Sequence, residues 1–592
     1  MTSRPHANLT RRLLLVWAVL AVITLAVAAG RLANLELRGD DALRLVQVRD
    51  LLAGQGWWDL TQYRYDPPEG VVMHWSRLVD APIALLLLLL TPLLGQAHAE
   101  LAVLILVPLL TLGITVALVG KAAAMLFDVR TAGFAALTVG LLTPVLFQLQ
   151  PTRLDHHGWQ VAMCAAGVLG VAMRSPKGAW LAGFALAAGA TISLEMLPIA
   201  AGFAGYFTLR WLEDGRYRFE LSGFLQAFAA GLLVLYGVAL GPTFAQYCDA
   251  IGPAHLALFA FVALGVTALA ARRSLAPVLL VPLLGVTGLG GVGVFGALAP
   301  QCLAPPFAGL DPVVRSYWYE LIMEGRPAWE QAYDLAIPAV IQLLVGLTGT
   351  LFLATRGARG GRRFWWNYGA LLAVTLLFGL LTWRSMAFAG IVATVPLGWL
   401  VAHVLERLDR ASGGFAKAGG LVLLGLALMP SILFAAYERL APTPQAAIPQ
   451  AAAPQAPAGT TVLDSECSRP ETIARLASLP PGEMLALFDL APAILFHTGH
   501  SVTAAGYHRG EAAMADAIGA FIADPDEAEA LIRARGAAYV VTCADMSETA
   551  VYAQANPQGL AARLREGAPV SWLTSAPGFE QGPLKVYRVR PE

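Results

Sequence analysis

The sequence has few charged residues and no excess of either sign. Of its 592 residues only 14% are charged, against 57% that are hydrophobic, and 40 basic side chains balance 40 acidic ones. A soluble domain carries about 25% charged residues, so this composition excludes an ordinary soluble protein. Without a basic excess we expect no nucleic-acid partner. What is present instead is a series of apolar runs of about 18–20 residues, the length that spans a bilayer as a helix. These runs indicate a multi-pass membrane protein.

The positions of Lys and Arg predict the topology. Arg11 and Arg12 precede the first apolar run, so we expect a retained first helix with a cytoplasmic N-terminus; a cleaved signal peptide is the alternative. Most later basic loops are expected on the same face of a bacterial inner membrane. Because each span takes the chain to the opposite face of the membrane, four segments are then expected on the periplasmic face, namely residues 31–100, the turn at Asp155, residues 297–335 and everything after about residue 437.

Hydropathy and charge together predict an all-α membrane domain over residues 1–440 with about thirteen transmembrane helices. The apolar run at 81–95 has only about 15 residues, and we expect it to lie at the membrane surface within the first outer loop. A linker rich in Pro and Ala follows at 441–459. Beyond it, at 460–592, strand and helix patterns alternate, which predicts a small periplasmic α/β domain.

The chain contains only five cysteines. Cys164 falls in a predicted span, whereas the other four fall on the predicted outer side. An oxidising periplasm would permit the disulfides Cys248–Cys302 and Cys467–Cys543. Four free thiols are the alternative, because spacing alone does not establish pairing.

Aspartates occur in two separate segments that are expected near the outer face of the membrane. Asp40 and Asp41 follow the first span, and Asp155 precedes His156 and His157 in the second outer turn. Each Asp also suits the start of a helix, where it would act as a cap. Capping does not explain two carboxylates beside a membrane surface, however, and the expected topology puts both segments on one face. Carboxylates with an imidazole suit a divalent cation, which there would neutralise a phosphate or pyrophosphate leaving group.

Further polar residues share this face by topology. The long loop at 297–335 contains Glu324 and Arg326, and Arg384 lies at the outer end of a late span. Arg384 either extends its charge to the interface or binds phosphate. Glu195, at the outer end of another span, is a functional candidate to which the sequence assigns no role. The glycine-rich string GLGGVGVFG lies within a predicted span, which favours close helix packing over a nucleotide site.

In order and position these motifs resemble the catalytic subunits of oligosaccharyltransferases, within the GT-C class of membrane glycosyltransferases. The resemblance rests on GDDALRLVQVRDLLAGQGW, YDPPEGVVMHWSRLVD, the Asp-His-His turn and LIMEGRP. It implies a divalent cation, Mn²⁺ or Mg²⁺, held by Asp155 and His157, with Glu324 as the acidic residue of the long loop. One of Asp40 and Asp41 would be a further metal ligand and contact the acceptor; the sequence leaves open which.

The same resemblance implies how substrates bind. The donor would be a polyprenyl-linked sugar, and Arg384 would contact its phosphate. His74, Arg77 and Arg326 are further candidates for substrate binding. Membrane lipid surrounds the site, and the acceptor, whether glycan, lipid or protein, is not identified.

One motif of that family is missing. The C-terminal domain lacks the Trp-Trp-Asp-Tyr-Gly block that recognises an Asn-X-Ser/Thr acceptor, and the WWDL at 57–60 stands in the wrong loop. The domain has instead a stretch that contains His497, His500, His508 and Arg509. We favour a connection with solvated polar residues there; the alternative is a loop that reaches over the site. Protein N-glycosylation is therefore doubtful.

The hypothesis from the sequence is a metal-assisted glycosyltransferase that uses a polyprenyl phosphate or pyrophosphate donor at the periplasmic face. Asp40, Asp41 or Glu324 would act in catalysis, because a carboxylate can orient or deprotonate an acceptor hydroxyl. A metal-independent GT-C transferase with a polyprenyl-phosphate monosaccharide donor is the first alternative. A transporter or flippase is the second, although the charges cluster in loops at one face rather than at the midplane.

Overall fold

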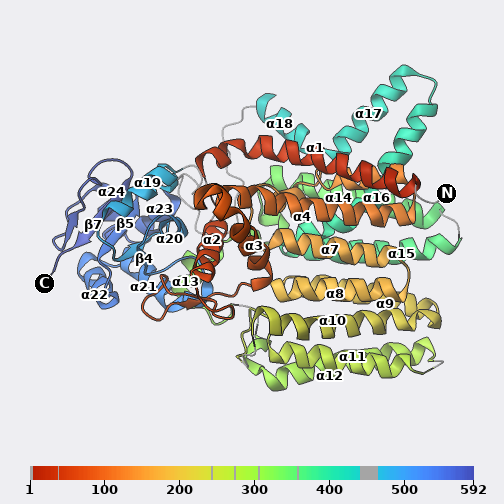
Figure 1. The fold of residues 1–592 in the computed structure, drawn as a ribbon, viewed down its shortest axis with the longest axis horizontal. Coiled ribbons are helices and arrows are strands. Elements are labelled where there is room, and N and C mark those ends of the chain that lie inside the picture. The colour runs from red at the N-terminus through yellow and green to blue at the C-terminus, as the bar shows by residue number, and fades with distance from the viewer. Residues whose placement is uncertain are drawn as a thin grey trace.

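The computed structural model describes residues 4–591 except 36, 38, 242–244, 273–274, 305–306, 357–358 and 441–464. The predicted linker at 441–459 lies outside these residues. Figure 1 shows a bundle of roughly parallel long helices with a compact domain at one end. The N-terminus lies at the other end of the bundle, so the two termini are on opposite sides of it (Figure 1).

The bundle is built from helices that follow one another along the chain, mostly through short connections. They are α1 (Arg4–Asn34), α3 (Arg77–Leu94), α4 (Gln96–Leu126), α5 (Val129–Thr138), α6 (Thr143–Phe147), α7 (His157–Ala172), α8 (Pro176–Ile192), α9 (Met196–Glu213), α10 (Arg218–Ala239), α11 (Pro253–Ala270), α12 (Pro277–Leu298), α14 (Tyr333–Arg356), α15 (Arg359–Leu381), α16 (Met386–Arg410), α17 (Gly414–Leu428) and α18 (Ser431–Leu440). The first outer loop, between α1 and α3, and the loop between α12 and α14 are long.

Within the described residues, nine helices are long and apolar enough to cross a membrane, or ten if the bent pair α17 and α18 is one span. The predicted number of about thirteen also included shorter segments; α7 and α8 have 16 and 17 residues. The nine include α3, which we expected at the membrane surface. Ser76 caps α3 at its first turn, so the helix begins before the apolar run and reaches 18 residues.

Small residues allow the bundle helices to approach closely. A Cβ on Gly183 of α8 would lie 2.2 Å from the carbonyl oxygen of Phe224 in α10. In the string GLGGVGVFG, a Cβ on Gly291 would lie 2.6 Å from Val262 Cγ2 of α11. These glycines therefore serve helix packing, as predicted.

The first outer loop and the C-terminal domain contain the strands and most of the remaining helices. The loop contains α2 (Gly39–Leu52) and a hairpin of β1 (Thr61–Gln62) and β2 (Val71–Val72). The domain contains α19 (Pro470–Ala474), β3 (Glu483–Ala486), α20 (Ala491–His497), β4 (Ser501–Val502), α21 (Glu511–Ile522), α22 (Pro525–Arg535), β5 (Tyr539–Cys543), α23 (Ser547–Ala555), α24 (Leu560–Glu566), β6 (Leu573–Ser575) and β7 (Leu584–Val589).

The strands of the C-terminal domain form one sheet in the order β4-β3-β5-β7-β6, in which β3 runs parallel to β4 and β5, and β7 runs antiparallel to its neighbours. An α/β domain was predicted, and the structure confirms it.

The long loop between α12 and α14 contains α13 (Pro312–Tyr317) and several turns of 3-10 helix. Among the described residues the 3-10 helices are η1 (Gly215–Tyr217), η2 (Pro300–Leu303), η3 (Tyr319–Leu321), η4 (Met323–Gly325), η5 (Ala328–Glu330), η6 (Trp383–Ser385), η7 (Glu466–Ser468), η8 (Arg475–Ser478) and η9 (His508–Gly510). Of these, η4, η6 and η9 carry predicted site residues.

The molecule has two hydrophobic cores, and their boundary differs from the predicted boundary between the domains. One core lies in the bundle. The other joins buried side chains of α2, the hairpin, α3 and α4 to those of the C-terminal domain, for example Leu43 and Val46 with Ile494 and Val502. Tyr65 strengthens this union, because its hydroxyl donates to the carbonyl oxygen of Ala505 at 2.9 Å. The first outer loop and the C-terminal domain are therefore packed as one body.

Both disulfides that the sequence permits are present in the structure. Cys248 bonds to Cys302, which ties the α10–α11 loop to the long loop, and Cys467 bonds to Cys543 inside the C-terminal domain. Cys164 is buried and free.

Candidate functional site

The acidic start of α2 meets the turn before α7. Asp41 is fully buried, and its Oδ1 accepts hydrogen bonds from the backbone N–H groups of Leu154 (2.7 Å) and Asp155 (3.0 Å). The carboxylate thus fixes a turn that is 113 residues distant in the chain. The two acidic segments of the sequence lie together in the structure.

Asp155 has one oxygen at the start of α7 and the other in a charged cluster. Its Oδ1 accepts from the backbone N–H of His157 at 3.1 Å, but the N-cap position of α7 is His156, so Asp155 is not the N-cap that the simpler interpretation predicted. Its Oδ2 lies 3.4 Å from Nδ1 of His157 and forms an ion pair with Arg153. All three side chains are buried. The structure therefore brings together the two metal ligands that the resemblance implied.

Glu195 and Arg384 lie on the other side of His157. Glu195 directly precedes α9, and its Oε2 lies 3.8 Å from Nε2 of His157. Its Oε1 forms an ion pair with Nε of Arg384, in η6, at 2.9 Å. His156, His157 and Glu195 each offer a ligand atom, and these atoms all lie within 4.8 Å of one another.

The long loop approaches the same place through η4. The backbone N–H of Trp383 donates to the carbonyl oxygen of Arg326 at 2.9 Å, which places the loop beside Arg384. Glu324 lies near enough for its charge to act on Asp40 and Arg153. The guanidinium of Arg326 pairs with Glu330 at 2.8 Å, within its own loop.

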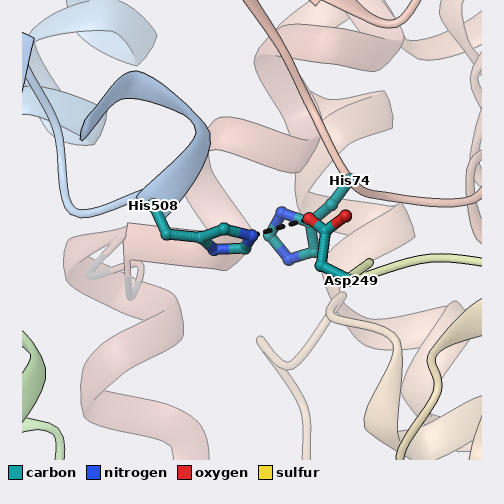
Figure 2. A group of neighbouring side chains, drawn as sticks. All are labelled: His74, Asp249 and His508. Atoms are coloured by element: carbon teal, nitrogen blue, oxygen red, sulfur yellow. Dashed lines mark hydrogen bonds and ion pairs between the residues drawn. The ribbon is translucent and has the colours of Figure 1, made fainter. Parts of the chain in front are cut away.

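The C-terminal domain also reaches the site, which we had not favoured. The hydroxyl of Tyr507 donates to Oδ1 of Asp40 at 3.0 Å. The next residue, His508, meets His74 of the first outer loop and Asp249 of the α10–α11 loop, as Figure 2 shows. The prediction of solvated residues was wrong here, because the first outer loop and the domain share a core that carries this segment onto the site.

The contacts around His508 and Arg509 form a junction of the three segments in Figure 2. His508 Nε2 lies 2.6 Å from Oδ2 of Asp249, and the rings of His508 and His74 are 4.9 Å apart. Arg509 donates to both oxygens of Asp249 at 2.8 Å. His74, Asp249 and His508 each offer a ligand atom within 4.8 Å of the others, but Arg509 already donates to both oxygens of Asp249, so charge-assisted hydrogen bonds hold the junction.

Other predicted residues have structural partners. Arg77 is buried; it pairs with Asp80 at 3.0 Å and donates to the carbonyl oxygens of Trp57 and Asp59. His500 contacts the carbonyl oxygens of Gly482 and Leu476 inside the C-terminal domain. The structure does not bring these two side chains to Asp155.

The pKa values of the carboxylates in these turns are shifted in opposite directions. Burial, together with the charges of Glu324 and Asp155, raises the pKa of Asp40. Burial, opposed by Arg153, raises the pKa of Asp41 to about 7. Burial acts in the same sense on Asp155, but the charges of Arg153 and His157 outweigh it and hold its pKa well below the usual range. Arg153 is thus the main counter-charge to several carboxylates.

The donor set of this group fits a divalent cation. Among the described residues, Asp41 Oδ2, Nε2 of His157 and Glu195 Oε2 are buried without a hydrogen-bond partner, whereas Asp155 Oδ2 pairs with Arg153 and faces Nδ1 of His157. Buried polar atoms without partners are costly. Carboxylate oxygens and neutral imidazole are ligands of Mn²⁺ and, for the oxygens, of Mg²⁺.

Sequence reasoning missed Arg153, Asp249 and Tyr507. Arg153 stands two residues before Asp155, and an Arg in an outer turn was the available signal. No local pattern marks Asp249 or Tyr507, because their partners are 259 and 467 residues away.

Comparison with solved structures identifies the fold as that of archaeal oligosaccharyltransferases. The oligosaccharyltransferase AglB from Archaeoglobus fulgidus, in complex with an inhibitory peptide and a dolichol-phosphate, superposes with a TM-score of 0.67 at 14% identity, over 95% of this chain and 72% of that one. A structure of the Archaeoglobus fulgidus enzyme with Zn and sulfate gives 0.61 at 14% identity, over 93% and 70%. The fold expected from the motif resemblance is thereby confirmed. No protein-family model and no curated protein sequence matches the chain.

Proposed function

We propose that the chain is a membrane glycosyltransferase. It moves a sugar or oligosaccharide from a polyprenyl phosphate or pyrophosphate donor to an acceptor on the periplasmic side of a bacterial inner membrane. The observation that carries the proposal is the meeting of Asp41, Asp155 and His157 with Arg384 at the end of the bundle that bears the C-terminal domain. A site there suits a donor whose lipid lies among the spans and whose phosphate lies at the membrane face.

The residues divide between cation and phosphate. Asp41, Asp155 and His157, with Glu324 from the long loop, would hold Mn²⁺ or Mg²⁺. When bound, the cation supplies positive charge that stabilises the leaving phosphate. Arg384 binds phosphate oxygens through its N–H groups.

Asp40 serves the acceptor side of the site. Its carboxylate orients the acceptor hydroxyl or takes its proton, and a raised pKa suits a base. Tyr507 of the C-terminal domain holds this carboxylate from the outer side. His74 and Arg326 are the further candidates for contact with substrate.

A metal-independent transferase is the second candidate, and the position of Arg153 favours it. The Arg153 guanidinium lies on Asp155, where it supplies positive charge without a cation. Dependence on metal distinguishes the two candidates.

Release of radiolabelled sugar from a polyprenyl-diphosphate donor by the purified protein tests the proposal. We expect release with Mn²⁺, loss of release in EDTA, and a fall of at least about 100-fold in Asp155→Asn, because the cation loses a ligand. Asp526→Asn, a change of an exposed aspartate in α22, is the control. Equal release in EDTA would establish the metal-independent enzyme. If the protein neither released sugar nor bound the donor, both candidate functions would be contradicted.

A further inference from the structure

We infer that Glu195 links the two halves of the proposed site: one carboxylate oxygen is a ligand of the divalent cation, and the other holds the phosphate-binding Arg384. This inference rests on the proposed function and goes beyond it, because neither the motifs nor the resemblance gives Glu195 a role.

The geometry places the two oxygens of Glu195 on different partners. Oε1 lies 2.9 Å from Nε of Arg384, while Oε2 faces Nε2 of His157 at 3.8 Å. Within the described part of the chain, Oε2 and Nε2 of His157 have no hydrogen-bond partner, whereas Nδ1 of His157 faces Asp155. A distance of 3.8 Å is too long for a hydrogen bond, but it leaves room for an ion between two ligands.

The burial of the cluster supports a ligand rather than a surface ion pair. The side chains of His157 and Glu195 are 5% and 14% exposed. A solvated Glu–Arg pair would contribute little. Here the carboxylate closes a group with His156 and His157 whose ligand atoms lie within 4.8 Å of one another. Glu195 therefore lies at Nε2 of His157, whereas Asp155 lies at Nδ1 of the same ring.

Through its contact with Arg384, Glu195 affects phosphate binding in opposite directions without and with the metal. Without metal, the Glu195 charge competes with a phosphate for the Arg384 guanidinium and repels that phosphate. With metal, the same charge retains the cation and so favours the phosphate. Glu195 thus couples metal binding to donor binding, and linkage requires the coupling to be reciprocal.

The test uses the full-length protein in detergent, with Mn²⁺ binding followed by electron paramagnetic resonance and undecaprenyl phosphate binding followed by calorimetry. Glu195→Gln should weaken Mn²⁺ binding at least about tenfold, because mutation of a residue that only hydrogen-bonds a metal ligand already lowers metal affinity by that factor. In EDTA the variant should bind undecaprenyl phosphate several-fold more tightly than the wild type, and in Mn²⁺ more weakly. A variant that has merely lost its fold would bind less in both conditions.

Glu529→Gln is the matched control, because it breaks the Glu529–Arg533 ion pair in α22 of the C-terminal domain without touching His157 or any residue of the proposed site. It should leave both affinities unchanged. Unchanged Mn²⁺ affinity in Glu195→Gln, or phosphate binding that changes in the same direction with and without metal, would overturn this inference and leave the proposed function standing. If the wild type bound neither Mn²⁺ nor the lipid phosphate, the proposed function would fail as well.

Discussion

Asp40 and Asp41 are neighbours in the chain but face different partners. Asp41 is directed to the turn at Asp155, with Oδ2 free of hydrogen bonds among the described residues, whereas Asp40 accepts from Tyr507 of the C-terminal domain. Successive residues of a helix point about 100° apart, so one carboxylate reaches the bundle and the other the outer domain. This division assigns Asp41 to the proposed cation and Asp40 to the acceptor, a choice that the sequence left open.

The hydrogen bond from Tyr507 to Asp40 leads to a prediction for one residue. Tyr507→Phe removes a donor to a half-buried carboxylate, and such a bond contributes about 1.5–3 kcal/mol. We expect sugar transfer to fall by about 10–100-fold, with Mn²⁺ affinity unchanged. The measurement is the rate of sugar release beside a metal titration. Tyr63→Phe, which breaks an exposed Tyr–Asp contact in the first outer loop, should have no effect; an equal loss in both variants would remove Tyr507 from the site.

At the scale of elements, the α10–α11 loop connects parts that are distant in sequence. Asp249 pairs with His508 and Arg509, and its neighbour Cys248 bonds to Cys302 at the start of the long loop. The long loop in turn carries Glu324. The loop therefore joins the C-terminal domain to the loop that approaches Arg384, and Figure 2 shows the point of attachment.

Asp249→Asn should release this attachment. Loss of a bidentate, charge-assisted pair should speed amide hydrogen exchange at 245–252 and 507–510 about tenfold or more. Asp66→Asn, which breaks the Asp66–Arg535 pair between the first outer loop and the domain, is the control and should leave those segments protected. Exchange that is unchanged in Asp249→Asn would contradict the role of the junction.

The junction should also respond to acid. Burial raises the pKa of Asp249, but hydrogen bonds from His508 and Arg509 outweigh it and hold the pKa well below its usual range. A carboxylate with a lowered folded-state pKa adds stability above its unfolded pKa of about 4 and loses that contribution as the pH falls further. The attachment is therefore at full strength at neutral pH.

At the scale of the whole molecule, the first outer loop and the C-terminal domain behave as one packed body on the end of the bundle. Their buried side chains form a single core, although more than 400 residues separate them, as in the contact of Arg64 with the carbonyl oxygen of Leu495. Burial of apolar side chains contributes about 1.5–3 kcal/mol each, so this core holds the domain without help from the linker.

Cleavage of the linker tests this union. A protease site inserted between residues 441 and 459 should yield two fragments that elute together in size-exclusion chromatography in detergent. Both cysteines of the second disulfide lie in the C-terminal fragment, so only non-covalent contacts retain it. Separation of the fragments after cleavage would show that the shared core is too weak to hold the domain.

Composition and local pattern determined much of this protein. The scarcity of charge and the long apolar runs require helices in a membrane, and the alternating pattern after residue 460 requires an α/β domain. The Asp-His-His turn and the two first-loop acids were identified because polar residues beside an apolar span are costly and therefore conspicuous. The length of α3 was underestimated, since the cap at Ser76 extends a helix that the apolar run alone makes short.

Tertiary structure decided what the local pattern could not. Which of two adjacent aspartates faces the bundle, the pairing of Glu195 with both His157 and Arg384, and the reach of Tyr507 to Asp40 all depend on contacts between segments far apart in the chain. A sequence encodes hydrophobic periodicity over a few turns of helix, whereas the partner of a polar group depends on how whole elements pack. Residues at 40, 155, 195, 384 and 507 form one candidate site only through that packing.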